Sequence, residues 1–271
     1  MSKTKTRSKH AEKAAGRIKK AERRRQILLE LKLRPHVRIS DLARSFNVST
    51  ETVRRDFDAL AQDGLVARAH GGASAAAQGH YPSLDERTAD RAAERERIGG
   101  KASELVNDGD TVMIDSGSTT IQLARALAVN GTRCTVITNS IPVATTLGDG
   151  AADVILCPGE YLATESAVIG ADTLEYLSRF NVDRCMIGAS GLSEEGPSEA
   201  ISGFAAVKRA MLQRAANRHL LIDAQKYGAR GLVRAGTLSD LDSIVVDAAP
   251  DGTLRAALEA SKVAVIVADT G

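Results

Sequence analysis

The densest group of potential ligand-binding side chains in this sequence is the run Asp115-Ser116-Gly117-Ser118-Thr119-Thr120. It follows an apolar stretch, residues 111–114, with the length of a buried strand, and it opens a helical pattern. Free amides at a helix N-terminus, several hydroxyls and a glycine that permits a tight turn favour the binding of a dianion such as phosphate. The alternative is a polar turn in which Ser118 or Thr119 caps the helix. Asp115 suits a sugar hydroxyl, or a role in holding the loop, better than a phosphate.

Polar residues also follow three later strand-like runs, at residues 138–140, 188–191 and 223–228. Ligands of open parallel sheets bind outside the carboxyl ends of the strands, so we expect these segments to converge on the first loop. Lys226 would supply the charge that a phosphate needs. Lys208 is also available, but it lies in a helical run, where a solvated charge is the alternative. The predicted effector-binding residues are Asp115, Ser116, Gly117, Ser118, Thr119, Thr120, Asn139 and Lys226.

A second functional pattern lies near the N-terminus, where helical segments at about residues 40–46 and 49–61 are separated by two or three residues. This spacing is typical of a helix-turn-helix, whose later helix enters the major groove of DNA. Val53, Phe57 and Leu60 recur at helical spacing and are expected to form the buried stripe of the later helix. We expect a preceding helix to begin near residue 21.

The opposite face of that helix would present Thr50, Glu51, Arg54 and Arg55 to DNA, because arginine pairs bidentately with guanine. The alternative is that both arginines are solvated charges paired with neighbouring acidic residues. Asp56 is expected to be structural, orienting Arg55 or an amide of the first helix. A short strand at residues 65–68, with His70, would form a wing. The predicted DNA-binding residues are Ser40, Ser49, Thr50, Glu51, Thr52, Arg54, Arg55, Arg68 and His70, with Ser40 and Ser49 as helix N-caps.

Charge divides the 271 residues into two parts. Residues 1–75 hold 18 Lys and Arg against 8 Asp and Glu, a net charge of +10, whereas residues 76–271 hold 18 against 26, a net charge of −8. A basic head on an acidic body indicates that only the head meets a polyanion. Residues 1–25 are either a disordered basic tail or an arm that follows phosphates. Aromatic residues are only 3%, which disfavours modules that bind nucleic acid by base stacking.

Downstream of the head, short apolar runs alternate with helical patterns, which predicts an α/β domain with a mostly parallel sheet covered on both faces. We expect a helical stretch at about residues 85–106 and later helices at 171–179, 205–217 and 253–261. The predicted organisation is a basic tail (1–20), a winged helix-turn-helix domain (21–73), a linker (74–84) and an effector-sensing domain (85–271). The three cysteines are expected to be buried and unpaired. No membrane span, secretory signal, metal site or dinucleotide fingerprint is recognisable, so we expect a cytoplasmic protein without cofactors.

The run from Ser49 to Phe57, followed by the run from Gly64 to Ala73, resembles the DeoR family of bacterial transcription regulators. The resemblance extends over about residues 20–270 and implies a winged helix-turn-helix head and a sugar-phosphate sensor domain similar in fold to ribose-5-phosphate isomerase. It also implies a repressor that acts as an oligomer, a dimer or tetramer. This sequence departs from the family pattern at Ser118, where threonine is usual, and at Pro158-Gly159, where two glycines are common. It also lacks the acidic residue often found shortly before Lys208.

Three functional hypotheses follow. The first is a repressor of carbohydrate or polyol catabolism genes that binds a double-stranded DNA operator and responds to a phosphorylated sugar or polyol. The second is a sugar-phosphate isomerase-like enzyme with a DNA-binding head, which would need a general base such as His219, His80, Asp115 or Asp223. The third is a constitutive DNA-binding scaffold with an empty pocket. Thermal stabilisation by a sugar phosphate would distinguish the first from the third.

Overall fold

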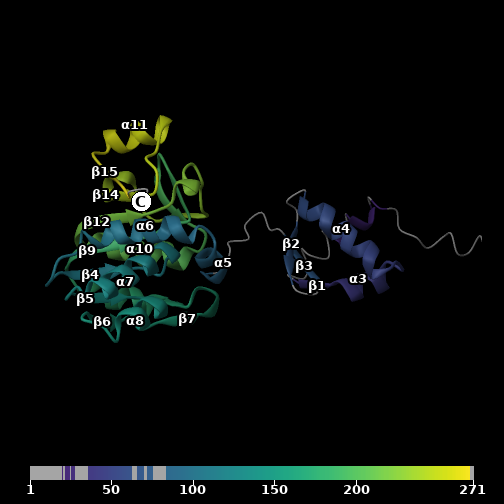
Figure 1. Ribbon diagram of the computed structural model, residues 1–271, viewed down its shortest axis with the longest axis horizontal. Coiled ribbons are helices and arrows are strands. Elements are labelled where there is room, and N and C mark those ends of the chain that lie inside the picture. The colour runs from purple at the N-terminus through teal and green to yellow at the C-terminus, as the bar shows by residue number, and fades with distance from the viewer. Residues whose placement is uncertain are drawn as a thin grey trace, which may run out of the picture. The chain divides into compact units, whose positions relative to one another are not determined.

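The structure is a computed structural model that describes residues 20, 22–24, 26–27, 36–62, 66–69, 72–75 and 84–268. The chain divides into two compact units, residues 1–81 and 82–271, and each is described by itself (Figure 1). The last described strand of the first unit ends at Ala75, and the first described helix of the second unit begins at Leu84. The domain boundaries expected from the sequence stay predictions.

In the N-terminal unit, the described residues 20, 22–24 and 26–27 are helical, in agreement with the helix expected to begin near residue 21. This helical segment precedes α3 (Ile39–Ser45) and α4 (Thr50–Gln62), which a short turn joins. Asn47 adopts a left-handed conformation in this turn, with φ of 51°, which asparagine tolerates better than most residues. An antiparallel sheet accompanies the helices, with the order β1-β3-β2 and the bounds β1 (His36–Arg38), β2 (Val66–Ala69) and β3 (Gly72–Ala75). The predicted helix-turn-helix is confirmed, as is the wing strand predicted at residues 65–68, which is β2. Two further strands, β1 and β3, extend the wing sheet.

The C-terminal unit is built on a seven-stranded parallel sheet with the order β15-β14-β12-β9-β4-β5-β6 (Figure 1). The strands are β4 (Thr111–Ile114), β5 (Thr135–Thr138), β6 (Asp153–Leu156), β9 (Val182–Ile187), β12 (Ala215–Leu221), β14 (Ser243–Val246) and β15 (Ala264–Val267). The chain runs outward from β4 to β6 and then returns to the other side of β4 at β9. The order therefore reverses between β4 and β9, and this is the switch point at which such sheets bind ligands.

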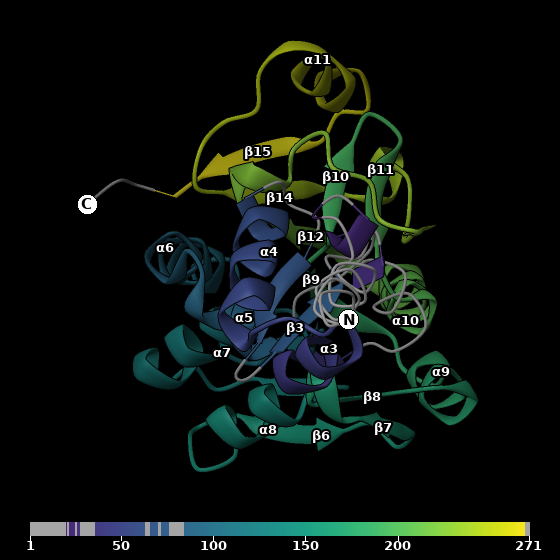
Figure 2. The same cartoon turned by 90° about the vertical axis from the view of Figure 1, so that its right-hand side faces the viewer.

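Helices cover both faces of this sheet (Figure 2). Val112 and Ile114 of β4 pack with α6, α7 and α8, whereas Met113 packs with α9, α10 and α11, because successive side chains of a strand point to opposite faces. The helices are α6 (Ala92–Ser103), α7 (Ser118–Asn130), α8 (Ile141–Leu147), α9 (Ala171–Ser178), α10 (Ser202–Arg214) and α11 (Gly252–Ala260). The predicted α/β class with a mostly parallel sheet is confirmed.

Two small antiparallel sheets near the ends of the central strands were not expected. β7 (Glu160–Leu162) and β8 (Ala167–Ile169) form a hairpin joined by the 3-10 helix η1 (Ala163–Glu165). The second sheet contains β10 (Gly191–Ser193), β11 (Gly196–Glu199) and β13 (Val233–Arg234). These strands are two to four residues long, too short to produce a readable alternation of apolar and polar residues. Two further 3-10 helices are η2 (Ala224–Lys226) and η3 (Leu238–Asp240).

Two helix predictions are corrected in their bounds. The stretch expected at residues 85–106 is divided into α5 (Leu84–Ala89) and α6, because Arg91 adopts a left-handed conformation with φ of 46° that interrupts the helix. The helix expected at 205–217 ends at Arg214, and the next residues already belong to β12, where they pair with β9. The three cysteines are buried and unpaired, as predicted.

Candidate functional sites

The exposed face of α4 carries the residues predicted to contact DNA. Val53, Phe57 and Leu60 are buried in the core of the N-terminal unit, which leaves Arg54 and Arg55 on the opposite side with 64% and 79% of their side chains exposed. Glu51 lies 3.9 Å from Arg54 and 3.3 Å from Arg55. These pairs are solvated and weak, so both arginines can exchange Glu51 for a base edge or a phosphate.

Ser49 caps α4, as predicted: its hydroxyl accepts a hydrogen bond of 3.1 Å from the Thr52 amide. Ser40 does not cap α3, because the helix already begins at Ile39; its hydroxyl instead contacts Asp41 at 3.4 Å. Ser40, Ser49, Thr50 and Glu51 are exposed and Thr52 is half-buried. The Arg68 backbone lies in β2, but its side chain is outside the described part of the chain, as is all of His70.

Asp56 is structural, as expected, but it has neither of the two expected partners. Its buried carboxylate accepts hydrogen bonds from the side chains of Arg23 and Arg24 in the preceding helical segment, whereas Arg55 pairs with Glu51. The carboxylate thus attaches the first helical segment to α4. A buried charge needs such partners, because desolvation strongly disfavours an unpaired one.

The loop after β4 is organised around Asp115. One carboxylate oxygen, Oδ1, accepts hydrogen bonds from the Gly117 amide at 2.9 Å and from the Thr120 hydroxyl at 2.7 Å. The other, Oδ2, accepts from the Gly188 amide at 2.8 Å, which joins the ends of β4 and β9 across the switch point. Gly117 has an ordinary extended conformation, and a Cβ there would lie only 3.3 Å from Asp115 Oδ1. Close packing, and not an unusual backbone angle, explains this glycine.

Lys208 provides the charge that balances Asp115. Its buried ammonium group, on α10, contacts Asp115 Oδ2 and lies 3.3 Å from Glu199 Oε1. Burial raises the pKa of Asp115, but the charge and hydrogen bond of Lys208, with hydrogen bonds from Thr120 and Gly117, lower this pKa below its ordinary value. The sequence alternative of a solvated Lys208 is therefore wrong. Its two acidic partners come from other elements: Asp115 follows β4, and Glu199 belongs to β11.

Lys226 lies in η2, shortly after the end of β12. Its ammonium group donates a hydrogen bond of 2.8 Å to the Ala189 carbonyl and lies 3.9 Å from Asp223 Oδ2. The pKa of Lys226 is lowered to about 8, chiefly by burial; the charges of Arg95 and Arg87 act in the same direction, and those of Asp223 and Glu199 oppose it. We name Asp115, Glu199, Lys208, Asp223 and Lys226 the strand-end cluster.

Hydroxyl and amide groups complete the same edge of the sheet. Ser116, Ser118, Thr119 and Thr120 are all buried at the start of α7. Asn139, at the end of β5, donates a hydrogen bond of 3.0 Å to the Val168 carbonyl, whereas its buried Oδ1 atom accepts none from the described residues. An acceptor in this state fits a donor such as a ligand hydroxyl. Of the predicted effector residues, Thr120 is engaged with Asp115 and therefore serves the loop.

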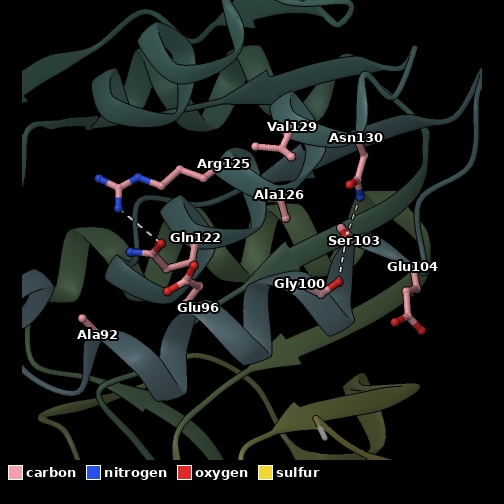
Figure 3. A pocket seen from close by; sticks show the side chains of 10 residues that line it. All are labelled: Ala92, Glu96, Gly100, Ser103, Glu104, Gln122, Arg125, Ala126, Val129 and Asn130. Carbon is pink, nitrogen blue, oxygen red and sulfur yellow. Dashed lines mark hydrogen bonds between the residues drawn. The ribbon is translucent and has the colours of Figure 1, made fainter. Parts of the chain in front are cut away.

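A separate cavity of about 620 Å³ lies between α6 and α7 (Figure 3). The lining includes Glu96, Gln122, Arg125 and Val129, and Arg125 donates a hydrogen bond of 3.3 Å to Gln122. The helices approach closely at Gly99, where a Cβ would lie 2.5 Å from the Gln122 backbone. None of the predicted effector residues lines this cavity.

In the described part of the chain, no helix is long and apolar enough to cross a membrane. The same residues contain no group of three or more His, Cys, Asp or Glu side chains that could hold a metal ion.

Comparisons with known proteins identify both units. The family described as the DeoR C terminal sensor domain matches residues 90–248, and the DeoR-like helix-turn-helix domain matches residues 23–78. The chain is 32% identical over 235 residues to the glycerol-3-phosphate regulon repressor of Escherichia coli, covering 86% of this chain and 93% of that protein. It is also 32% identical to the transcriptional repressor GlcR of Bacillus subtilis, covering 88% of this chain and 93% of that protein.

Among solved structures, ribose 5-phosphate isomerase A from Neisseria gonorrhoeae is 18% identical, covers 56% of this chain and 57% of that chain, and has a TM-score of 0.38.

Proposed function

Because the chain belongs to the DeoR family of transcription regulators, we propose that it represses genes of carbohydrate or polyol catabolism and that a phosphorylated sugar or polyol changes its affinity for the operator. The observation that carries this proposal is the loop from Asp115 to Thr120. It joins the switch point of a parallel sheet to the N-terminus of α7, near the buried Lys208 and the half-buried Lys226.

The head would recognise operator DNA through α4. Arg54 and Arg55 would read base edges in the major groove, while Ser49 and Thr50 at the start of the helix would contact phosphates. Arg68 and His70 belong to the same proposal as wing residues. Two half-sites would require a homo-oligomer whose two-fold axis matches the operator. Such a regulator would act in the cytoplasm, where its operator and its effector meet.

The effector would place its phosphate at the amides and hydroxyls of Ser116, Ser118 and Thr119, within reach of the charges of the strand-end cluster. A hydroxyl of the sugar or polyol would donate to Oδ1 of Asn139. The ligand thus needs two chemically different parts, an anion and a hydroxylated chain. The name of the E. coli relative makes glycerol 3-phosphate a suitable first probe.

The proposal is tested with two measurements on the full chain. Thermal unfolding in a panel of phosphorylated sugars and polyols, with their unphosphorylated counterparts as controls, should reveal stabilisation by at least one phosphorylated compound. That compound should change the affinity for an operator, selected from random-sequence DNA, by about 5–150-fold, the usual range for coupled sites. Specific DNA binding that no compound alters would reject the effector part, and the absence of specific DNA binding would reject the regulator.

The alternative of a sugar-phosphate isomerase needs a general base beside the ligand. His219 is buried within β12, where its Nδ1 atom lies 2.8 Å from the Ser243 hydroxyl, and burial lowers its pKa to about 4. His80 lies outside the described residues. Asp115 and Asp223 are already paired with cations. Incubation with pentose and hexose phosphates tests this alternative, and the formation of product would favour it over the regulator.

A further inference from the structure

A buried ion pair holds the first described helix of the C-terminal unit to the edge of the sheet. Arg87 lies on α5, and its guanidinium group contacts Glu165 Oε2 in η1, the turn of the β7–β8 hairpin. Both side chains are buried. The polypeptide that leaves the N-terminal unit after Ala75 therefore enters the C-terminal unit at a helix that is fixed by charge.

Arg95 reinforces this attachment. Its guanidinium group donates hydrogen bonds to the Arg87 and Asp90 carbonyls, the latter at 2.6 Å, and lies 3.5 Å from Asp223 Oδ2. It thereby connects the end of α5, the start of α6 and the strand-end cluster. Arg91 adds an ion pair with Asp247, beyond the end of β14. The contacts that hold α5 and the start of α6 in place therefore include Asp223, a member of the strand-end cluster proposed to bind the effector.

The charges at this edge are balanced and close enough to influence one another. The pKa of Glu165 is raised above its ordinary value, because burial outweighs the charge and hydrogen bond of Arg87. The charge of Glu199 also raises this pKa, and that of Lys208 lowers it. The charge of Arg87 also acts on Lys226. Among the described residues five cations face five carboxylates: Arg87, Arg91, Arg95, Lys208 and Lys226 against Asp115, Glu165, Glu199, Asp223 and Asp247. A bound dianion would add two negative charges to this neutral group, so we expect a carboxylate to lose its cation to the ligand.

We propose that Glu165 is this carboxylate, and that a phosphorylated effector competes with it for Arg87 and so opens an α5 latch. Asp115 and Asp223 follow central strands, whereas Glu165 lies in the turn of a two-stranded hairpin outside the central sheet, where displacement disrupts less. Opening the Arg87–Glu165 pair releases α5, the first described helix that follows the DNA-binding unit in the chain, and we expect this release to change operator affinity. This inference rests on the proposed function and names its regulation.

The latch is tested with Glu165→Gln in the full-length protein, which removes the charge and retains the size of the side chain. The matched control is Glu175→Gln, which removes a carboxylate from an exposed pair on α9, 2.6 Å from Arg179. Operator affinity is measured with and without glycerol 3-phosphate, and with inorganic phosphate to separate the anion from the polyol. Thermal stabilisation by the same probes reports ligand binding.

The expected result is that Glu165→Gln retains stabilisation by the ligand, but that its operator affinity without ligand already equals that of the ligand-bound wild type. Its response should then fall from about 5–150-fold to less than twofold, while Glu175→Gln responds like the wild type. A normal response of Glu165→Gln would overturn the latch alone. Loss of ligand binding in this variant would also overturn it, because Glu165 would then belong to the binding site. A wild type that responds to no probe would reject the proposed function, and the latch with it.

Hydrogen–deuterium exchange on the wild type makes the test independent of the folding of the variant. Opening of the Arg87–Glu165 pair should accelerate exchange of the backbone amides of α5 when the effector binds, while those of α9 stay unchanged. Unchanged or slower exchange in α5 under saturating, stabilising ligand would overturn the proposal.

Discussion

Lys208 and Asp115, 93 residues apart in the sequence, form a buried ion pair where the strand order of the sheet reverses. The two oxygens of Asp115 also accept hydrogen bonds from the amides of Gly117 and Gly188, so one carboxylate fixes the loops that leave β4 and β9. This pair brings a positive charge to the N-terminal end of α7 while keeping the site neutral. It is the centre on which the proposed effector site depends.

Replacing Lys208 by methionine should destabilise the protein by about 3–5 kcal/mol, because Asp115 and Glu199 then remain as buried carboxylates without their cation. Chemical denaturation measures this change, and Lys262→Met, at an exposed position, serves as the control. A loss below about 1 kcal/mol would show that the buried pair contributes little.

The same variant should respond differently to pH. In the wild type the folded-state pKa of Asp115 is below its ordinary value, so its contribution to stability is present above the unfolded pKa and is lost as the pH falls through the folded pKa. Without Lys208 that pKa rises, and protonation relieves the unpaired charge. The difference in the free energy of unfolding between the Lys208 variant and the wild type should therefore decrease from pH 7 to pH 4. A difference that stays constant over this range would show that the unpaired charge of Asp115 is not its cause.

Thr119→Val should weaken the effector response and leave operator binding intact, because it replaces a buried hydroxyl by a methyl group of the same shape at the start of α7. Dose–response curves of operator binding measure the effect. Thr120→Val is the informative comparison: its hydroxyl holds Asp115, so this change should reduce stability as well. A variant that responds at the wild-type effector concentration would show that the Thr119 hydroxyl does not contact the effector; it does not cap α7 either, since the N-cap is Gly117 and no side chain caps the helix.

Arg54→Ala should reduce operator affinity by about 1–3 kcal/mol and relax the preference at one base position, as expected for an arginine that reads a base edge. Binding to a set of singly substituted operators measures both effects. Arg133→Ala is the control, since Arg133 is a comparably exposed arginine in the other unit. Unchanged affinity and preference would refute the role in base recognition.

Effector affinity should decrease as the pH rises through about 8, where burial places the pKa of Lys226. An anion binds better to the charged amine, and a phosphate monoester is already largely dianionic in this range. Between about pH 8 and 10.5 the unfolded chain binds this proton and the folded chain does not, so the free energy of unfolding should rise with pH. Calorimetric titrations at several pH values test the first effect. Equal pH profiles for the wild type and Lys226→Met would argue against it.

Local patterns predicted the elements of both units well. The stripe of Val53, Phe57 and Leu60 identified the buried face of α4, and the apolar run at residues 111–114 identified β4, because these patterns depend on residues a few positions apart. The convergence of the segments after Ile114 and Ile187 followed from the rule that strand ends of a parallel sheet meet at one edge. The assignment of individual effector and DNA contacts stays a prediction.

Contacts between distant segments were not predictable in this way. Glu199 lies beside Lys208, but it comes from a strand too short to recognise in the sequence. Arg87 and Glu165 lie 78 residues apart, and nothing in their local sequence indicates that they pair. Asp56 was expected to orient Arg55 or a backbone amide, whereas side chains of the preceding helical segment hold it. Burial of a charge is a tertiary property, and local spacing does not encode it.

The order of the two units along the chain has a consequence for synthesis. Translation completes the helix-turn-helix and its wing strands, which end at Ala75, long before it reaches Lys208 and Lys226. A domain folds when its residues have left the ribosome, so a nascent or prematurely terminated chain would have the proposed DNA-binding surface before it had the proposed effector site. Such a fragment would bind DNA without responding to the effector, and the cell would have to degrade it to keep the genes inducible.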